Sequence, residues 1–182
     1  MIRRDGLYGR LRERSGAGGG TLYVFVAGLA AMSVSGLLAF LLGQPLVFPS
    51  LRPTVYLFFE APMSEVASPR NTVLGHFIGV FVGLAMLWAF GLLGEPSAAQ
   101  AGTSLAYAAA GALSVAVTGA LQLLTRTWHA PAGATTLIVS LGVLGTVREV
   151  LVLVIGIVTL TATGWTINRL ARIPVPVWAA KE

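Results

Sequence analysis

The sequence contains no cysteine and very little charge. Without cysteine, the chain can form neither disulfides nor thiolate metal sites. Only 10% of its 182 residues are charged and 55% are hydrophobic, whereas about 25% of residues are charged in soluble domains. With a mean hydropathy of +0.81, the composition excludes an ordinary soluble domain and predicts an integral membrane protein.

Carboxylates and histidines are also scarce. The glutamates nearest the apolar runs stand close to the ends of those runs (Glu60, Glu65, Glu95 and Glu149), so we expect no ring of carboxylates for a cation. His76 and His129 lack metal-ligand spacing, and neither a nucleophile elbow nor a phosphate-binding glycine loop is present. We therefore expect no enzyme activity, no cofactor and no metal.

Positive charge gathers at the two ends of the chain. The flanking basic residues are Arg3, Arg4, Arg10, Arg12, Arg14, Arg169, Arg172 and Lys181. Such residues typically flank membrane spans on the cytoplasmic side, so we expect cytoplasmic termini and no nucleic-acid partner. The run over residues 21–43 exceeds the roughly 7–15 residues of a signal-peptide core. An alanine- and glycine-rich composition favours a bacterial cytoplasmic membrane.

Four long apolar runs predict transmembrane helices over residues 21–43, 72–94, 103–124 and 150–168. Each is long enough, or nearly so, to cross a hydrocarbon core of about 30 Å. The expected fold class is an all-α membrane protein, a small bundle of four long helices plus two broken half-helix segments. One membrane domain, 21–171, would lie between a basic, glycine-rich tail, 1–20, and a short tail, 172–182.

The broken segments interrupt the apolar pattern at corresponding places. The first, 44–62, is rich in proline and contains a short apolar run, 54–59; the second, 126–136, precedes the run 137–144. Proline lacks an N–H donor and disfavours helix before it. The two halves, 21–94 and 103–171, form a weak repeat at a spacing of roughly 80 residues, and paired breaks of this kind point to a transporter site.

Two topologies are compatible with this order. In one, four helices cross and the breaks are re-entrant; in the other, the breaks also cross, which gives six crossings and inverted repeats. The loop 95–103 has no Lys or Arg, and only six crossings place that loop outside with Arg70 and Arg126 inside. Because cytoplasmic loops carry the excess of Lys and Arg, the six-crossing topology fits better.

The breaks are the predicted binding site. A half-helix that begins inside the membrane directs its free N–H groups and positive dipole end at the midplane, where small anions bind. Thr54 and Thr135 would offer hydroxyls there and Arg52 a fixed charge, while Gly133 would let a ligand approach the backbone.

Other roles are open for several of these residues. Arg52 could extend to lipid headgroups, and His129 could form an interfacial pair with Trp128. His76 could be a hydrogen-bonded core histidine. As a site residue, either histidine could carry a coupled proton, since the ordinary pKa of histidine lies near 6.5.

Three motifs together resemble the HPP family of integral membrane proteins. They are Phe48-Pro49-Ser50-Leu51-x-Pro53-Thr54-x-Tyr56-Leu57, then Ala67-Ser68-Pro69-Arg70-Asn71 with Gly75-His76, then His129-x-Pro131-Ala132-Gly133-Ala134-Thr135. The resemblance covers about residues 22–168. Two positions depart from the family pattern: the name-giving His-Pro-Pro reads His129-Ala130-Pro131, and Arg52 stands where the family usually has glycine.

The resemblance implies a probable transporter, and a plant plastid branch of the family is associated with nitrite. It brings forward Arg70, Asn71, His76, His129 and Pro131. We expect a transporter or channel for a small monovalent anion, nitrite first, that works as a homo-oligomer in the lipid bilayer. The alternative is a non-transporting subunit or scaffold of a partner complex.

Overall fold

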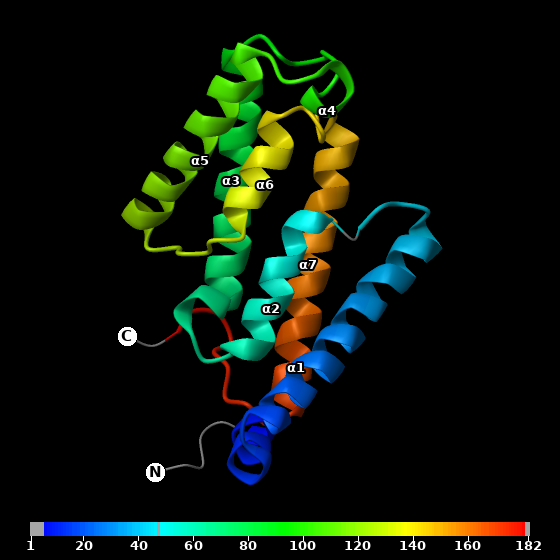
Figure 1. Ribbon diagram of the computed structural model, residues 1–182, viewed down its shortest axis with the longest axis vertical. Coiled ribbons are helices and arrows are strands. Elements are labelled where there is room, and N and C mark those ends of the chain that lie inside the picture. The colour runs from blue at the N-terminus through cyan, green and yellow to red at the C-terminus, as the bar shows by residue number, and fades with distance from the viewer. Residues whose placement is uncertain (1–5, 47, 181–182) are drawn as a thin grey trace.

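The computed structural model describes residues 6–46 and 48–180, which form a bundle of helices joined by short loops (Figure 1). The elements are α1 (Gly6–Leu42), the 3-10 helix η1 (Pro49–Leu51), α2 (Arg52–Glu60), the 3-10 helix η2 (Glu65–Ala67), α3 (Pro69–Ala89), α4 (Ala98–Ala101), α5 (Leu105–Thr125), α6 (Ala132–Ser140) and α7 (Val147–Leu170). The described residues contain no strand. Because α1, α3, α5 and α7 are long and apolar enough to cross a membrane, the predicted all-α membrane fold is confirmed.

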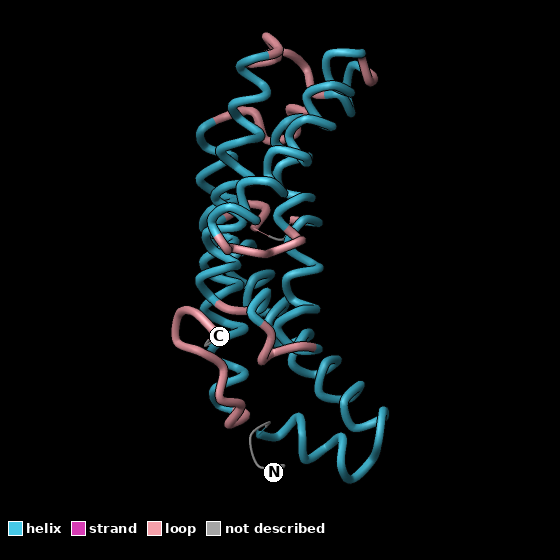
Figure 2. Tube along the Cα trace, turned by 90° about the vertical axis from the view of Figure 1, so that its left-hand side faces the viewer, coloured by secondary structure: helices cyan, strands magenta, loops and turns pink. Residues whose placement is uncertain are grey.

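The N-terminal region is helical from Gly6 onward, so most of the predicted basic, glycine-rich tail over residues 1–20 belongs to α1. Residues 1–5 lie outside the described part, as do residues 181–182 of the predicted C-terminal tail. The helix α1 begins at Gly6 and kinks at Ser15 and Gly16, where Gly16 has a φ of +57°. Beyond the kink, Gly19 packs on the backbone of Leu11, where a side chain would collide. Figure 2 shows this sharp turn at the lower end of the molecule.

Local signals set the ends of the long helices. Ser68 caps α3 by accepting a hydrogen bond from the Asn71 N–H (3.3 Å), and Pro69 occupies the first helical position. This helix ends at Ala89 rather than near 94, because Gly91 and Gly94 have φ values of +66° and +82°.

The start of α7 differs from the prediction. Arg148 and Glu149 do not interrupt the chain but lie in the first turn of the helix, because Thr146 and Glu149 form a capping box. The start of α6 also differs: the break ends at Pro131, so Gly133 and Thr135 belong to the helix.

The two half-helices are short. Both α2 and α6 have nine residues, which corresponds to about 14 Å and is less than half of a core of about 30 Å. Neither can cross a membrane alone, so each would cross only together with the extended break that precedes it.

The described ends of the chain lie together at one end of the bundle. The Leu7 N–H donates to the Ala171 carbonyl (2.9 Å), and the Tyr8 hydroxyl donates to the Glu60 carbonyl (3.1 Å). The segment 90–104 lies at the opposite end, beyond the C-terminus of α3 (Figure 1). The six-crossing topology requires this arrangement, with the segment 90–104 and the chain termini at opposite ends. In the four-crossing topology that segment would lie on the same side as the termini.

The halves are related as an inverted repeat. In Figure 1, α1 runs upward, α2 downward and α3 upward, whereas α5, α6 and α7 run down, up and down. A Cβ built on Gly75 would lie 3.3 Å from the Thr127 carbonyl oxygen, and one on Gly156 would lie 2.9 Å from that of Leu46. The two glycines are 81 positions apart in the sequence, and so are the two residues whose carbonyls they approach.

A second pair of contacts obeys the same spacing. A Cβ on Gly83 would lie 2.7 Å from the Val139 Cβ, and one on Gly164 would lie 2.6 Å from the Phe58 ring. The spacing of 81 also relates Thr54 to Thr135. Each half-helix is therefore packed in the same way against the glycines of a long helix.

Candidate functional site

Four buried polar side chains meet where the two half-helices begin. We call Thr54, His76, His129 and Thr135 the histidine cluster; each is at most 1% exposed. They come from α2, α3, the break before α6, and α6. Residues far apart in the sequence thus form one polar site inside an apolar bundle, where it must be satisfied from within.

The cluster is a continuous hydrogen-bonded chain. The Thr54 Oγ1 lies 3.0 Å from the Nε2 of His76 and 3.0 Å from the Nε2 of His129, and the two Nε2 atoms are 3.2 Å apart. At one end, His129 Nδ1 lies 2.8 Å from the Val66 carbonyl oxygen; at the other, His76 Nδ1 lies 2.8 Å from Thr135 Oγ1. The imidazole planes are inclined by 65°.

These partners assign the protons of the neutral cluster. Because a carbonyl oxygen can only accept, His129 donates from Nδ1 and its Nε2 is a bare acceptor. Every contact of Thr54 is satisfied if His76 donates from Nε2 to Thr54 and Thr54 donates to His129. Thr135 then donates to His76 Nδ1. An added proton can pass between the two rings through the Thr54 hydroxyl.

The break is held in place from α3 and α5. The Gln122 side chain accepts a hydrogen bond from the His129 N–H (3.1 Å) and donates to the His129 carbonyl (3.3 Å) and to the Gly75 carbonyl (3.4 Å). A Cβ on Gly75 would lie 2.7 Å from the His129 Cβ. The glycine thus lets His129 approach α3, and Gln122 fixes its backbone.

Arg70 lies outside the cluster, at the end of the bundle that holds the chain termini. Its guanidinium donates to the carbonyls of Arg126 (2.8 Å) and Thr125 (3.3 Å), the last carbonyls of α5, and to the Asn71 side chain (3.1 Å). It therefore caps the C-terminus of α5, a favourable place for a cation.

A pocket of about 380 Å³, the Arg70 pocket, opens beside these residues. It is lined by Glu65, Arg70, Asn71, Thr125, Arg126, Trp128, Ala179 and Ala180. Glu65 and Trp128 directly precede Val66 and His129 in the sequence, so the wall of this pocket adjoins one end of the histidine cluster.

The structure does not bring Arg52 to the cluster. Arg52 is exposed and lines a shallow groove between α1 and α2 with Val24, Gly28, Met32, Val55, Tyr56 and Phe59. It lies on a different face of α2 from buried Thr54, so it offers no fixed charge beside the two histidines. This placement agrees with the alternative role, in which the side chain extends along the bundle surface.

The remaining predicted residues lie close by. Asn71 is 4% exposed and accepts from Arg70. Gly133 lies in the first turn of α6 with open space where a Cβ would stand, and Pro131 is buried directly before that helix.

Comparison with known protein families shows to which family this chain belongs. Residues 15–176 match the family described as HPP, transmembrane region. The chain belongs to the HPP family. A transmembrane protein of Dictyostelium discoideum is 32% identical over 94 residues, 52% of this chain and 30% of that relative; the match thus spans under a third of the relative's length. No solved structure matches this HPP protein.

Both departures from the HPP pattern fall outside the histidine cluster. Ala130, which replaces the proline after the name-giving histidine, is exposed, and so is Arg52. By contrast, Thr54, His76, His129 and Thr135 belong to the motifs and are buried. The four residues of the histidine cluster thus all come from the three motifs on which the resemblance was based.

Sequence reasoning missed two members of the site. Gln122 is the one amide side chain in the apolar helix α5, and that signal could have revealed it. The Val66 carbonyl could not have been found, because a backbone acceptor leaves no mark in a sequence. No group of three or more His, Cys, Asp or Glu side chains in residues 6–46 and 48–180 is placed to hold a metal ion.

Proposed function

We propose that this HPP protein is not an enzyme but transports a small monovalent anion together with a proton, with nitrite as the first candidate. The observation that carries the proposal is the buried hydrogen-bonded pair His76–His129, joined by Thr54 at the start of two half-helices. The protein would work as a homo-oligomer in the cytoplasmic membrane, with both termini in the cytoplasm.

The half-helices supply a favourable end for an anion. Thr54 is the third residue of α2, and Thr135 is the fourth residue of α6. The start of a helix carries the positive end of its dipole. In α6 the first N–H groups already donate to the preceding turn (Ala132 to His129, Gly133 to Ala130 and Ala134 to Pro131), and in α2 the Arg52 N–H donates to Pro49, so the dipole ends and the threonine hydroxyls, rather than free N–H groups, would favour an anion. Two such ends directed at one cluster would attract a single small anion between them.

An anion at this depth also needs a compensating charge, because an unpaired ion inside a bundle is strongly disfavoured. Neither nearby candidate arginine supplies it: Arg52 faces the groove between α1 and α2, and Arg70 caps α5. Protonation of a histidine would provide that charge. The anion and the proton would then bind together and cross without net charge.

The surroundings of the two rings permit this pH dependence. The groups that face them are the hydroxyls of Thr54 and Thr135, the Gln122 amide and the Val66 carbonyl. The charged side chains Glu65, Arg70 and Arg126 line the adjoining Arg70 pocket. With no carboxylate among the groups hydrogen-bonded to the rings, the bound anion would be what stabilises an imidazolium there.

A specific observation favours the second candidate, a subunit or scaffold without transport. His76 and His129 are at most 1% exposed, and no pocket described here is lined by either ring. A scaffold needs no pathway, and a buried histidine pair could serve only to hold α2, α3 and α6 together. The transport proposal requires that this closed form opens.

The direct test is influx of nitrite into liposomes that contain the purified protein, with chloride and formate as comparison anions. We expect nitrite influx well above that of protein-free liposomes, accelerated by an inward proton gradient. In His76→Ala, influx should fall roughly 10-fold or more, since a hydrogen bond to a charged group contributes about 1.5–3 kcal/mol. Ser114→Ala, which removes a buried hydroxyl bonded to Ser140, is the matched control. Absence of flux for all three anions, with folded protein, would favour the scaffold.

A further inference from the structure

A second pocket mirrors the Arg70 pocket at the opposite side of the repeat. This Arg148 pocket, of about 670 Å³, is lined by Gly43, Gln44, Pro45, Phe48, Val143, Leu144, Thr146, Arg148, Glu149 and Val152. The Arg70 pocket lies between the break after α5 and the start of α3. The Arg148 pocket lies between the break after α1 and the start of α7, which are the equivalent elements under the repeat.

The repeat places apolar residues where the polar site should recur. With the spacing of 81 that relates Thr54 to Thr135, His129 corresponds to Phe48 and His76 corresponds to Ile157. Phe48 is 6% exposed and Ile157 is 1% exposed. Each pair takes one residue from each half: His76 and Phe48 come from the first half, and His129 and Ile157 come from the second. On one side of the bundle the repeat therefore carries two histidines, and at the symmetry-related place it carries a hydrophobic pair.

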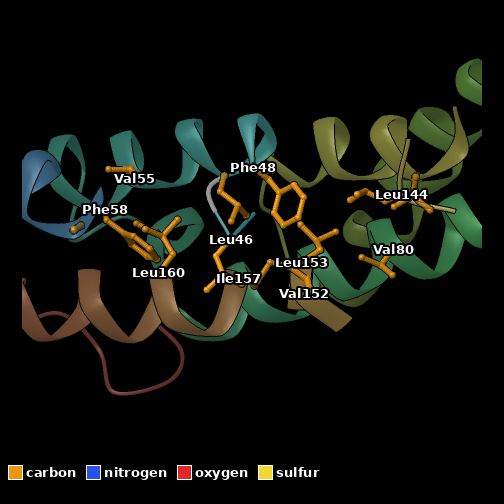
Figure 3. Close-up of a cluster of buried hydrophobic side chains, with 14 of the residues drawn as sticks. Leu46, Phe48, Val55, Phe58, Val80, Leu144, Val152, Leu153, Ile157 and Leu160 are labelled. Atoms are coloured by element: carbon orange, nitrogen blue, oxygen red, sulfur yellow. The ribbon is translucent and has the colours of Figure 1, made fainter. Parts of the chain in front are cut away.

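Packing makes this hydrophobic pair part of a continuous barrier. Figure 3 shows Leu46 and Phe48 directed at the α7 side chains Leu153 and Ile157. Leu46, which corresponds to Thr127, is 1% exposed, and its carbonyl approaches Gly156 of α7. The inverted repeat relates Thr54 to Thr135 and relates the two histidines to Phe48 and Ile157. The barrier therefore lies on one side of the two threonines, and the histidines lie on the other.

We infer that the Arg148 pocket is the mouth of the anion route on the side opposite the Arg70 pocket. Phe48, with Leu46 and Ile157, is the apolar barrier between this mouth and the histidine cluster. The inference rests on the proposed function for the identity of the ion. A hydrophobic constriction excludes water and therefore ions, while Arg148 at the mouth attracts a small monovalent anion.

Charges in the mouth agree with this role. Glu149 also lines the pocket, but its Oε2 accepts from the Thr146 N–H (2.9 Å) and from the Thr146 hydroxyl (2.8 Å). The carboxylate is thus held in the capping box of α7. Arg148, exposed at the helix start, supplies the positive charge that faces an entering anion.

Thiol accessibility tests the barrier without relying on transport, because the chain has no native cysteine. A Thr54→Cys variant would be treated with a small anionic thiol reagent from each side, in right-side-out and inverted vesicles. From the Arg148 side we expect negligible labelling. Adding Phe48→Ala should raise the labelling rate from that side roughly 10-fold or more, the change that 1.4 kcal/mol brings; Phe48→Leu, which keeps the position apolar and bulky, should not.

Two further variants keep the test decisive. Ile157→Ala should open the same barrier if Phe48→Ala does not fold, and Arg148→Gln should slow labelling by the anionic reagent in the opened protein. Fast labelling from the Arg148 side with Phe48 intact, or no change in either opened variant, would overturn the inference. Correct labelling without nitrite flux in the unmodified protein would refute the proposed function and leave the barrier in place.

Discussion

Thr54 places one hydroxyl within 3.0 Å of both imidazoles, whose Nε2 atoms also lie 3.2 Å from each other. The sequence could predict Thr54, Thr135, His76 and His129 as separate candidates, because each is a polar residue at a break or within an apolar run. It could not predict that His76 and His129 touch, since 53 residues separate them. It also misplaced Arg52, because spacing alone does not say which face of a nine-residue helix is buried.

Replacing Thr54 by valine should remove the hydroxyl that joins the two histidines while keeping the side-chain shape. We expect nitrite uptake to lose part of its dependence on the proton gradient, because only the direct Nε2–Nε2 contact (3.2 Å) then joins the rings. The measurement is uptake into liposomes at several external pH values. Thr54→Ser keeps the hydroxyl and should retain the pH dependence; an unchanged pH profile in Thr54→Val would contradict the relay.

Gln122 is a positioning residue whose role is testable by stability. In Gln122→Leu, the buried N–H of His129 loses its partner, at about 1–3 kcal/mol for an unsatisfied group, whereas the His129 carbonyl still accepts from the Ala132 N–H (3.0 Å). We expect a lower midpoint of thermal unfolding in detergent than for Leu123→Ala, an exposed change on the same helix. Equal midpoints would show that Gln122 does not hold the break.

At the scale of elements, glycine spacing decides how the half-helices pack. Gly75, Gly79 and Gly83 recur every four residues along α3, and the structure packs this ridge on the second break and α6. The sequence did not predict that α6 begins at Ala132, because an alanine- and threonine-rich turn after a proline is typical of both a loop and a helix start. Tertiary contact with α3 decides between them.

Alanine substitutions at glycine test this packing. Gly75→Ala should displace His129, since the new Cβ would lie 2.7 Å from the His129 Cβ, and should lower both stability and nitrite uptake. Gly119→Ala on α5, where the added Cβ meets nothing within 4 Å, should be neutral or stabilise by up to about 1 kcal/mol. Thermal unfolding and uptake are compared for both; a harmless Gly75→Ala would contradict the close approach.

At the scale of the whole molecule, the inverted repeat is the organising feature. Composition predicted the membrane class. The absence of Lys and Arg from the loop 95–103, with Arg70 and Arg126 inside, favoured six crossings and placed that loop opposite the termini. The structure places this loop at the end of the bundle opposite the described ends of the chain. The asymmetry between the histidine pair and the phenylalanine–isoleucine pair that the repeat relates to it is readable in the sequence only when the spacing of 81 is known, and the glycine contacts fix that spacing.

Sidedness can be tested with single cysteines. A cysteine at Gln100 should be labelled from the membrane face opposite to that which labels a cysteine at Val177, because the two positions lie at opposite ends of the bundle and both are exposed. Labelling in intact and inverted vesicles gives the answer. Reaction of both cysteines from the same face would contradict six crossings and support the four-crossing topology.

The measurement that bears most directly on the central claim is the ratio of protons to nitrite ions that enter protein-containing liposomes. An inward nitrite gradient is imposed with no initial pH difference, and internal pH and nitrite are followed together at several membrane potentials. The account predicts equal entry of protons and nitrite at a rate independent of potential, with both fluxes lost in His76→Ala. Nitrite entry that follows the membrane potential and carries no proton would contradict it.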